Sequence, residues 1–194
     1  MAIEIRRARV EDIPHMAYVV IQACGGYAEV MYEGVIPGRT LEQIVEHRFS
    51  RPGATSSFSN SRIAEDGGTV LGGLHAFPMD LMADDPVDPL IPEERFYIFA
   101  PFEHLHAEGS YYINAVAVYP QFQGRGIGRQ LITEAESEAM AKAFEEISLH
   151  VFAENVRAVE FYESLGYRES GRQPVVHHER LRYSGDLLLM TRKL

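Results

Sequence analysis

The sequence predicts a single α/β domain in which short strands alternate with amphipathic helices. Apolar runs of strand length recur along the chain, separated by stretches in which apolar residues repeat every three or four positions. Two of the early runs flank Asp66-Gly67-Gly68, a sequence typical of a hairpin turn. A chain of 194 residues with 46% hydrophobic content is large enough for one core. We therefore expect residues 1–194 to form one mixed α/β domain.

The first 77 residues predict three strands and two helices. Residues 3–7 alternate apolar and polar side chains, which favours a strand. Acids at Glu11 and Asp12, followed by Pro14, indicate the start of a helix. In chain order, the expected elements are a strand at 3–7, a helix from 10, a glycine-containing connection at 23–40, a helix at about 41–49, a polar loop at 51–60, and hairpin strands at 61–65 and 69–77.

The remainder predicts an insertion and then a second set of strands and helices. Residues 78–109 are irregular, rich in proline and aromatic residues, and long for a connection, which is typical of a functional loop. The expected elements after it are a strand at 111–118, a helix to about 144, a strand at 147–152, a helix at 156–165 ended by Gly166, and a last strand within 182–193. The long helix has an apolar face formed by Leu131, Ile132, Ala135, Ala139 and Ala143.

The composition excludes several classes of protein. A net charge of −10 argues against general nucleic-acid binding, which requires a basic surface. No apolar stretch approaches the roughly 18 residues of a membrane span, and the N-terminus has no signal-peptide core. The single cysteine, Cys24, excludes an internal disulfide and fits a reducing compartment. We expect a cytoplasmic protein that binds neither nucleic acid nor membrane, with a homodimer left open.

The segment Gln123-Gly124-Arg125-Gly126-Ile127-Gly128 joins a predicted strand to a predicted helix. Glycines let the backbone approach an anion closely, and the N–H groups and dipole at a helix start favour negative charge. A P-loop is excluded because the chain contains no Lys-Ser or Lys-Thr. A dinucleotide fingerprint, as in a nucleotide-dependent oxidoreductase, is disfavoured because its third glycine is absent. The segment predicts a different kind of phosphate site.

Gln123, Gly126 and Gly128 satisfy the pattern Q/R-x-x-G-x-G/A. About thirty residues later, the segment 155–167 satisfies N-x-x-A-x-x-F-Y-x-x-x-G-F/Y. With these two motifs, in this order, the chain resembles the GNAT superfamily of acetyl-CoA-dependent N-acetyltransferases. The resemblance implies a GNAT fold, an α/β (α+β) arrangement with a central, mixed, mostly antiparallel sheet flanked by helices and splayed central strands that hold the cofactor.

The resemblance also implies which residues bind acetyl-CoA. In the family, pantetheine lies along the central strand, and the glycine loop binds the pyrophosphate. The residues that match are Val116, Ala117, Val118, Gln123, Gly124, Arg125, Gly126, Ile127, Gly128, Arg129 and Asn155. Asn155 also suits the N-cap of its helix.

Tyr162 matches the family's general acid, which protonates the departing thiolate. A phenol of pKa about 10 is protonated at neutral pH and can serve in this way. The matching strand has no carboxylate at 112–115, so His75, His150 or a water chain remain as alternatives for the general base. His177 and His178 are adjacent, and on a strand they point to opposite faces, so no metal is expected.

The function that follows is direct transfer of an acetyl group from acetyl-CoA to a primary amine in a ternary complex. The alternative is a GNAT-fold module that senses an acyl-CoA without turnover. The acceptor, a small molecule or a peptide amine, is assigned to two segments, 25–40 and 78–109. In these segments Tyr27, Tyr32 and the aromatic cluster at 96–99 could enclose an organic amine, and Glu29 or Glu33 could attract its charge.

Overall fold

The computed structural model describes residues 2–83, 85, 88 and 91–194. Its centre is a seven-stranded sheet in the order β1-β2-β3-β4-β5-β7-β6. Only the β4–β5 pair is parallel, and the other five pairs are antiparallel. The strands are β1 Glu4–Arg7, β2 Ser61–Asp66, β3 Thr69–Pro78, β4 Tyr111–Val118, β5 Glu146–Phe152, β6 Arg168–Pro174 and β7 Asp186–Lys193.

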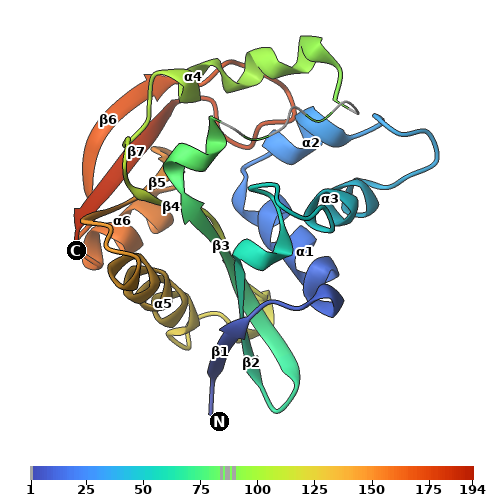
Figure 1. Ribbon diagram of the computed structural model, residues 1–194. Helices are drawn as coiled ribbons and strands as arrows, with labels where there is room; N and C mark the ends of the chain where they lie inside the picture. Colours follow the sequence, from blue (N-terminus) through green and yellow to red (C-terminus); the bar gives the residue numbers. More distant parts are fainter. Residues whose placement is uncertain (1, 84, 86–87, 89–90) are drawn as a thin grey trace.

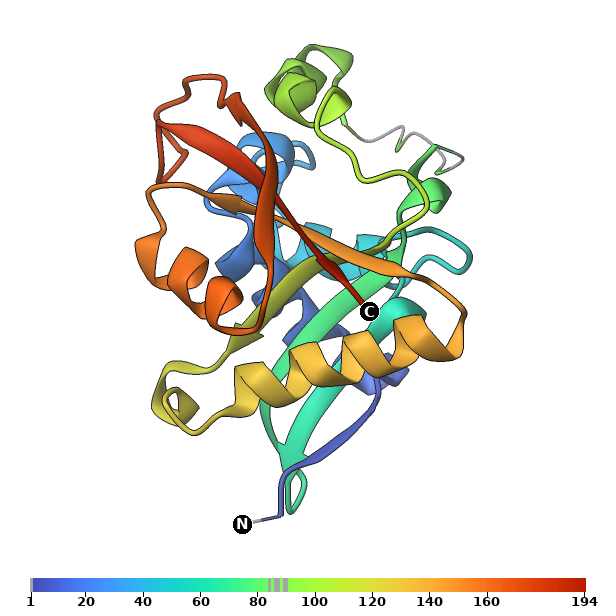
Figure 2. The ribbon, with the colours of Figure 1, turned by 90° about the vertical axis from the view of Figure 1, so that its left-hand side faces the viewer.

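Helices cover both faces of this sheet. Figure 1 shows α5 on one side of the strands and α1, α2 and α3 on the other. Figure 2 views the molecule from the α5 side, with α5 and α6 in front of the sheet. The helices are α1 Ile13–Ala23, α2 Tyr27–Tyr32, α3 Leu41–Phe49, α4 Ala100–Glu103, α5 Ile127–Ala141 and α6 Val156–Ser164.

The apolar face of α5 forms the core on its side of the sheet. Leu131, Ile132, Ala135 and Ala139 are fully buried against β3, β4 and β5 residues. Burying a side chain the size of leucine contributes about 1.5–3 kcal/mol, so this face anchors the start of the helix firmly. Ala143 was expected on the same face, but α5 ends at Ala141 and Ala143 is exposed with φ of 62°.

The two parallel strands pair only at their beginnings. β4 pairs with β5 at three residues of each, Tyr111, Tyr112 and Ile113 with Ile147, Ser148 and Leu149. Beyond these pairs β4 continues to Val118 and β5 to Phe152. The strands therefore diverge, and the β4 edge from Asn114 onwards has no β5 partner in the ladder. This opening confirms the splayed central strands.

A bulge in β4 lies where the divergence begins. His75 opposes Ala115 and Ala76 opposes Ile113, so Asn114 is an extra residue without a partner on β3. An extra residue bends its strand and increases the local twist. We attribute the opening between β4 and β5 to this bend.

Most predicted elements are confirmed, and two were missed. Residues 23–40, expected as a connection, contain α2, and residues 168–174, to which no element was assigned, form β6. The last strand, expected within 182–193, begins at Asp186. The described part of 78–109 contains short helical turns, among them η3 Met79–Met82 and η4 Glu93–Phe99. In the described residues, no helix has the length and hydropathy required to cross a bilayer.

Candidate functional site

The turn before α5 has a backbone that depends on glycine. Gly124 and Gly126 both have φ of 76°, and a Cβ on either would meet no atom within 4 Å. At the helix start, the N–H of Gln130 bonds to the carbonyl of Gly126 (3.2 Å). The N–H groups of the three residues before Gln130 have no carbonyl one turn earlier within the helix. They point out of the helix end, which together with the helix dipole suits an anion.

Side chains tie this turn to the neighbouring elements. The Gln123 amide donates to the carbonyl of Val118 at the end of β4 (3.1 Å). Arg129 donates to the hydroxyl of Ser164 at the end of α6 (3.3 Å). Both sequence motifs thus meet in space, although about thirty residues separate them. The side chain of Ile127 is buried in the core, so this residue can offer a ligand only its backbone.

A cavity of about 910 Å³ extends from the opening between β4 and β5. Ala115 and Val116 of β4 line it, as do Val151 and Phe152 of β5. It continues between α2, η3 and η4, so the two segments predicted to select the acceptor both contribute to its wall. The glycine turn does not line the cavity, and it lies beyond the β4 end of the opening.

Tyr162 and Asn155 lie on the side of this cavity formed by α6. The Asn155 side chain accepts a hydrogen bond from the N–H of Ala158 (3.4 Å), which caps the helix as expected. Tyr162 is half-buried, and its hydroxyl makes no hydrogen bond with a described residue. Burial raises the pKa of Tyr162 to about 12, so the phenol keeps its proton at neutral pH.

Both candidate histidines are held neutral by burial. In His75, Nε2 lies 2.9 Å from the Thr55 carbonyl and Nδ1 lies 2.9 Å from the Asn114 amide nitrogen. In His150, Nε2 lies 2.6 Å from the Leu105 carbonyl and Nδ1 lies 3.0 Å from the Tyr112 hydroxyl. Loss of solvation lowers the pKa of each imidazole to about 4.

Because of these two histidines, we expect the protein to lose stability in mild acid. Their folded-state pKa of about 4 lies below the ordinary 6.5, so between these values the unfolded chain binds protons that the folded chain does not. Their contribution is complete above pH 6.5 and declines as the pH falls towards 4, by at most about 1.4 kcal/mol per pH unit for each histidine. Urea titrations across this range should give a shallower pH dependence for His150→Gln than for the wild type. The same pH dependence of stability in both proteins would contradict the lowered pKa of His150.

An aromatic cluster drawn from α2, η4, α4 and β5 forms part of the cavity wall. The Tyr27 ring lies 5.6 Å from that of Phe99, 5.2 Å from that of Phe102 and 5.8 Å from that of Phe152. All four line the cavity. Tyr27 is 5% exposed, and its hydroxyl has no hydrogen-bond partner among the described residues. The wall is therefore apolar, with one buried polar atom unsatisfied.

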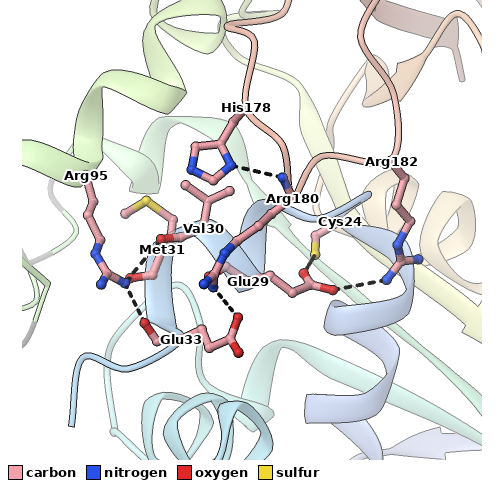
Figure 3. Close-up of polar contacts among 9 residues, drawn as sticks. All are labelled: Cys24, Glu29, Val30, Met31, Glu33, Arg95, His178, Arg180 and Arg182. Carbon is pink, nitrogen blue, oxygen red and sulfur yellow. Dashed lines mark hydrogen bonds and ion pairs between the residues drawn. The ribbon is translucent and has the colours of Figure 1, made fainter.

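Arginines from two other segments hold α2 in place (Figure 3). Arg95 of η4 donates to the carbonyls of Val30, Met31 and Glu33 and so caps the helix end. Arg180 and Arg182 approach from the connection between β6 and β7. Tyr27 and Tyr32 on α2 are thereby fixed in the cavity wall, together with Met31.

The expectation that Glu29 or Glu33 attracts the acceptor is not supported by this arrangement. Glu33 pairs with Arg180, and Glu29 pairs with Arg182 at 3.3 Å (Figure 3). Neither glutamate lines the cavity. Their charges are balanced by Arg180 and Arg182, which are about 150 residues away along the chain and were not expected nearby.

Two cavity residues near the opening were not singled out from the sequence. Tyr112 bonds to His150, and Asn114 bonds to His75. Both lie in the central strand, where alternation alone cannot distinguish core from site. The one feature of the sequence that pointed to this part of β4 was the absence of a carboxylate at 112–115.

Comparison with known proteins agrees with this geometry. The family model described as "Acetyltransferase (GNAT) family" matches residues 32–167. An uncharacterised N-acetyltransferase of Methanocaldococcus jannaschii is 42% identical over 57 residues, which are 29% of this chain and 25% of that protein. The chain spans less than half the length of the curated relatives that it matches.

Solved structures share the fold over almost the whole chain. An N-acetyltransferase from Staphylococcus aureus Mu50 has a TM-score of 0.69 at 19% identity, covering 97% of this chain and 100% of that one. The yncA protein of Salmonella typhimurium, solved with its cofactor acetyl-CoA, has a TM-score of 0.59 at 17% identity, covering 100% and 95%. At these identities the likeness concerns the fold. With a family match over more than half of its residues, the chain belongs to the acetyltransferase (GNAT) family.

Proposed function

We propose that this protein transfers an acetyl group from acetyl-CoA to a primary amine. The observation that carries the proposal is the opening between β4 and β5, which leads to an anion-suited helix start at one end and to a large cavity at the other. A donor with a phosphate-bearing end and a narrow thioester arm matches this arrangement. The amine would enter from the cavity.

The residues present fit such a donor. Gly124 and Gly126 leave open space where a side chain would otherwise stand, so phosphate oxygens can approach the N–H groups of the turn. Arg125 and Arg129 add positive charge beside it. The groups proposed to hold the donor are the β4 backbone at Val116, Ala117 and Val118, the turn from Gln123 to Arg129, and Asn155. The donor supplies an activated acyl thioester.

The proposed reaction needs one proton donor and one exit for a proton. The amine nitrogen forms a bond to the acyl carbon, the carbon–sulfur bond breaks, and the sulfur leaves with the electron pair. Tyr162 gives its phenolic proton to that sulfur and regains one from solvent, and its raised pKa keeps the proton available beforehand. A β4 N–H beside the opening stabilises negative charge on the thioester oxygen.

Neither His75 nor His150 suits the role of general base. Both ring nitrogens of each are engaged by neighbouring groups, and a pKa of about 4 makes each a weak base at neutral pH. We propose that the amine loses its proton through water in the cavity to bulk solvent. A sensor that binds acyl-CoA without turnover is the competing reading, and the thiol-release assay described in the Discussion distinguishes it.

The cavity favours an amine carried on an apolar body. Its inner wall is the aromatic cluster around Tyr27, which offers ring faces to a hydrophobic group or a cation. Four of the charged residues that line the described walls are acidic, namely Asp80, Asp85, Glu103 and Glu108, whereas Asp88 pairs with Arg48 and Arg51. This balance favours a cation over an anion.

Tyr27→Phe should have opposite effects on stability and on acceptor use. Removing a buried hydroxyl without a partner should raise the free energy of unfolding, by about 1 kcal/mol, because its desolvation is no longer uncompensated. If the acceptor bonds to this hydroxyl, its KM rises while the Kd for acetyl-CoA stays constant. Thermal unfolding, amine kinetics and calorimetry measure the three quantities. An unchanged acceptor KM would mean that the acceptor does not bond to the Tyr27 hydroxyl.

A further inference from the structure

Asn114 occupies an unusual place in the sheet. It is the extra residue of the β4 bulge, at the point where β4 leaves β5. Its neighbours Ile113 and Ala115 are buried, whereas Asn114 itself is exposed and lines the cavity. The bulge thus presents one polar side chain at the inner end of the opening, beside the β4 segment proposed to hold the thioester.

The hydrogen bonds of His75 determine which way the Asn114 amide faces. The carbonyl of Thr55 can only accept, so the Nε2 atom that lies 2.9 Å from it carries the ring proton. His75 is fully buried and neutral, so its Nδ1 has a lone pair and no proton. The Asn114 group that lies 2.9 Å from Nδ1 must therefore be the NH₂ donor.

This orientation leaves the amide oxygen available. With Nδ2 donating to His75, Oδ1 lies on the other side of the planar amide. No described residue donates a hydrogen bond to Oδ1, which has two lone pairs. An exposed acceptor atom of fixed direction at the inner end of the opening suits a ligand with N–H groups.

We propose that Asn114 Oδ1 accepts a hydrogen bond from the acceptor amine and orients its nitrogen towards the thioester, with His75 as the positioning residue that fixes the amide. This inference rests on the proposed function. It assigns the amine-orienting role to a neutral amide, on a strand that has no carboxylate at 112–115. His75 acts through Asn114 and takes no part in proton transfer.

The first test compares Asn114→Leu with Asn114→Asp. Leucine fills a similar volume without an acceptor atom, so kcat/KM for the amine should fall roughly tenfold or more, as for a lost hydrogen bond to a charged or polar donor. Aspartate keeps acceptor oxygens but cannot donate to His75, so kcat/KM should fall less than in Asn114→Leu. The probe is 2-phenylethylamine, or the best substrate of a primary-amine panel, and calorimetry should give an unchanged Kd for acetyl-CoA.

The second test is a double-mutant cycle with His75→Phe. In the wild-type background this change frees the Asn114 amide to rotate, and kcat/KM for the amine should fall. In the Asn114→Asp background the same change should have little effect, because both oxygens of a carboxylate accept. Thermal unfolding of each variant measures the stability lost through the buried substitution. If His75 had only a structural role, His75→Phe would have the same effect in both backgrounds.

Each outcome decides between named alternatives. Equal losses in Asn114→Leu and Asn114→Asp would overturn the proposal, because they would mean that Asn114 serves only to bond His75. A weakened Kd for acetyl-CoA in Asn114→Leu would also overturn it by placing Asn114 on the donor. Turnover that is insensitive to Asn114→Leu removes this inference alone, whereas a wild-type protein that acetylates no amine removes the proposed function and this inference with it.

Discussion

Replacing Gly126 with glutamate is expected to abolish binding of acetyl-CoA, with no heat detected in calorimetry at concentrations that saturate the wild type. The new side chain would project from the helix start into the space where phosphate must approach, and it would bring a negative charge to the N–H groups. The fold should survive because a Cβ at Gly126 meets no atom within 4 Å. The positive φ of 76° adds strain of about 1–2 kcal/mol.

Two control variants separate charge from strain. Gly126→Ala introduces the same backbone strain without charge or length, so binding should weaken less than in Gly126→Glu. Gly38→Glu introduces the same residue at another glycine with φ of 76° and open surroundings, and it should leave the Kd unchanged. Unchanged affinity in Gly126→Glu would contradict the assignment of the turn to the donor phosphates.

Replacing Tyr162 with phenylalanine is expected to lower kcat far more than it changes KM. The phenolic proton is needed only when the carbon–sulfur bond breaks, so its loss affects the transition state and not the ground-state complexes. The decrease should be on the order of tenfold to ten-thousandfold if this step limits the rate. Steady-state kinetics with saturating acetyl-CoA measures it.

Tyr167→Phe is the matched control for this change. Tyr167 belongs to the same motif, and its ring centroid lies 5.9 Å from that of Tyr162, but its hydroxyl donates to Glu136 (3.2 Å). This variant should lose some stability and keep its kcat. Wild-type turnover in Tyr162→Phe, or an equal loss in both variants, would return Tyr162 to a structural role.

The two elements that the sequence did not predict are stabilised by distant residues. α2 has six residues after two glycines, too short for a periodic signal, and Arg95, Arg180 and Arg182 hold it from elsewhere in the chain. β6 is a mostly exposed edge strand paired with β7, so its polar side chains do not alternate. In both cases tertiary contacts outweigh local preference.

In the candidate site, too, some features depend on nearby residues and others on distant ones. The glycine turn and the cap at Asn155 are local features, because positive φ and side-chain capping depend on nearby residues, and the structure has both where the motifs indicate. The state of His75 and His150 depends on burial and on partners 20 to 45 residues away. Sequence alone therefore left both as possible bases.

In the proposed function, the cavity delivers an amine to an acetyl thioester. The most direct test is release of free thiol from acetyl-CoA, measured with and without a panel of primary amines that includes 2-phenylethylamine. We expect at least one amine to accelerate release, with one acetylated amine formed for each thiol released. Binding of acetyl-CoA without release, or release at the same rate when every amine is omitted, would contradict the proposed function.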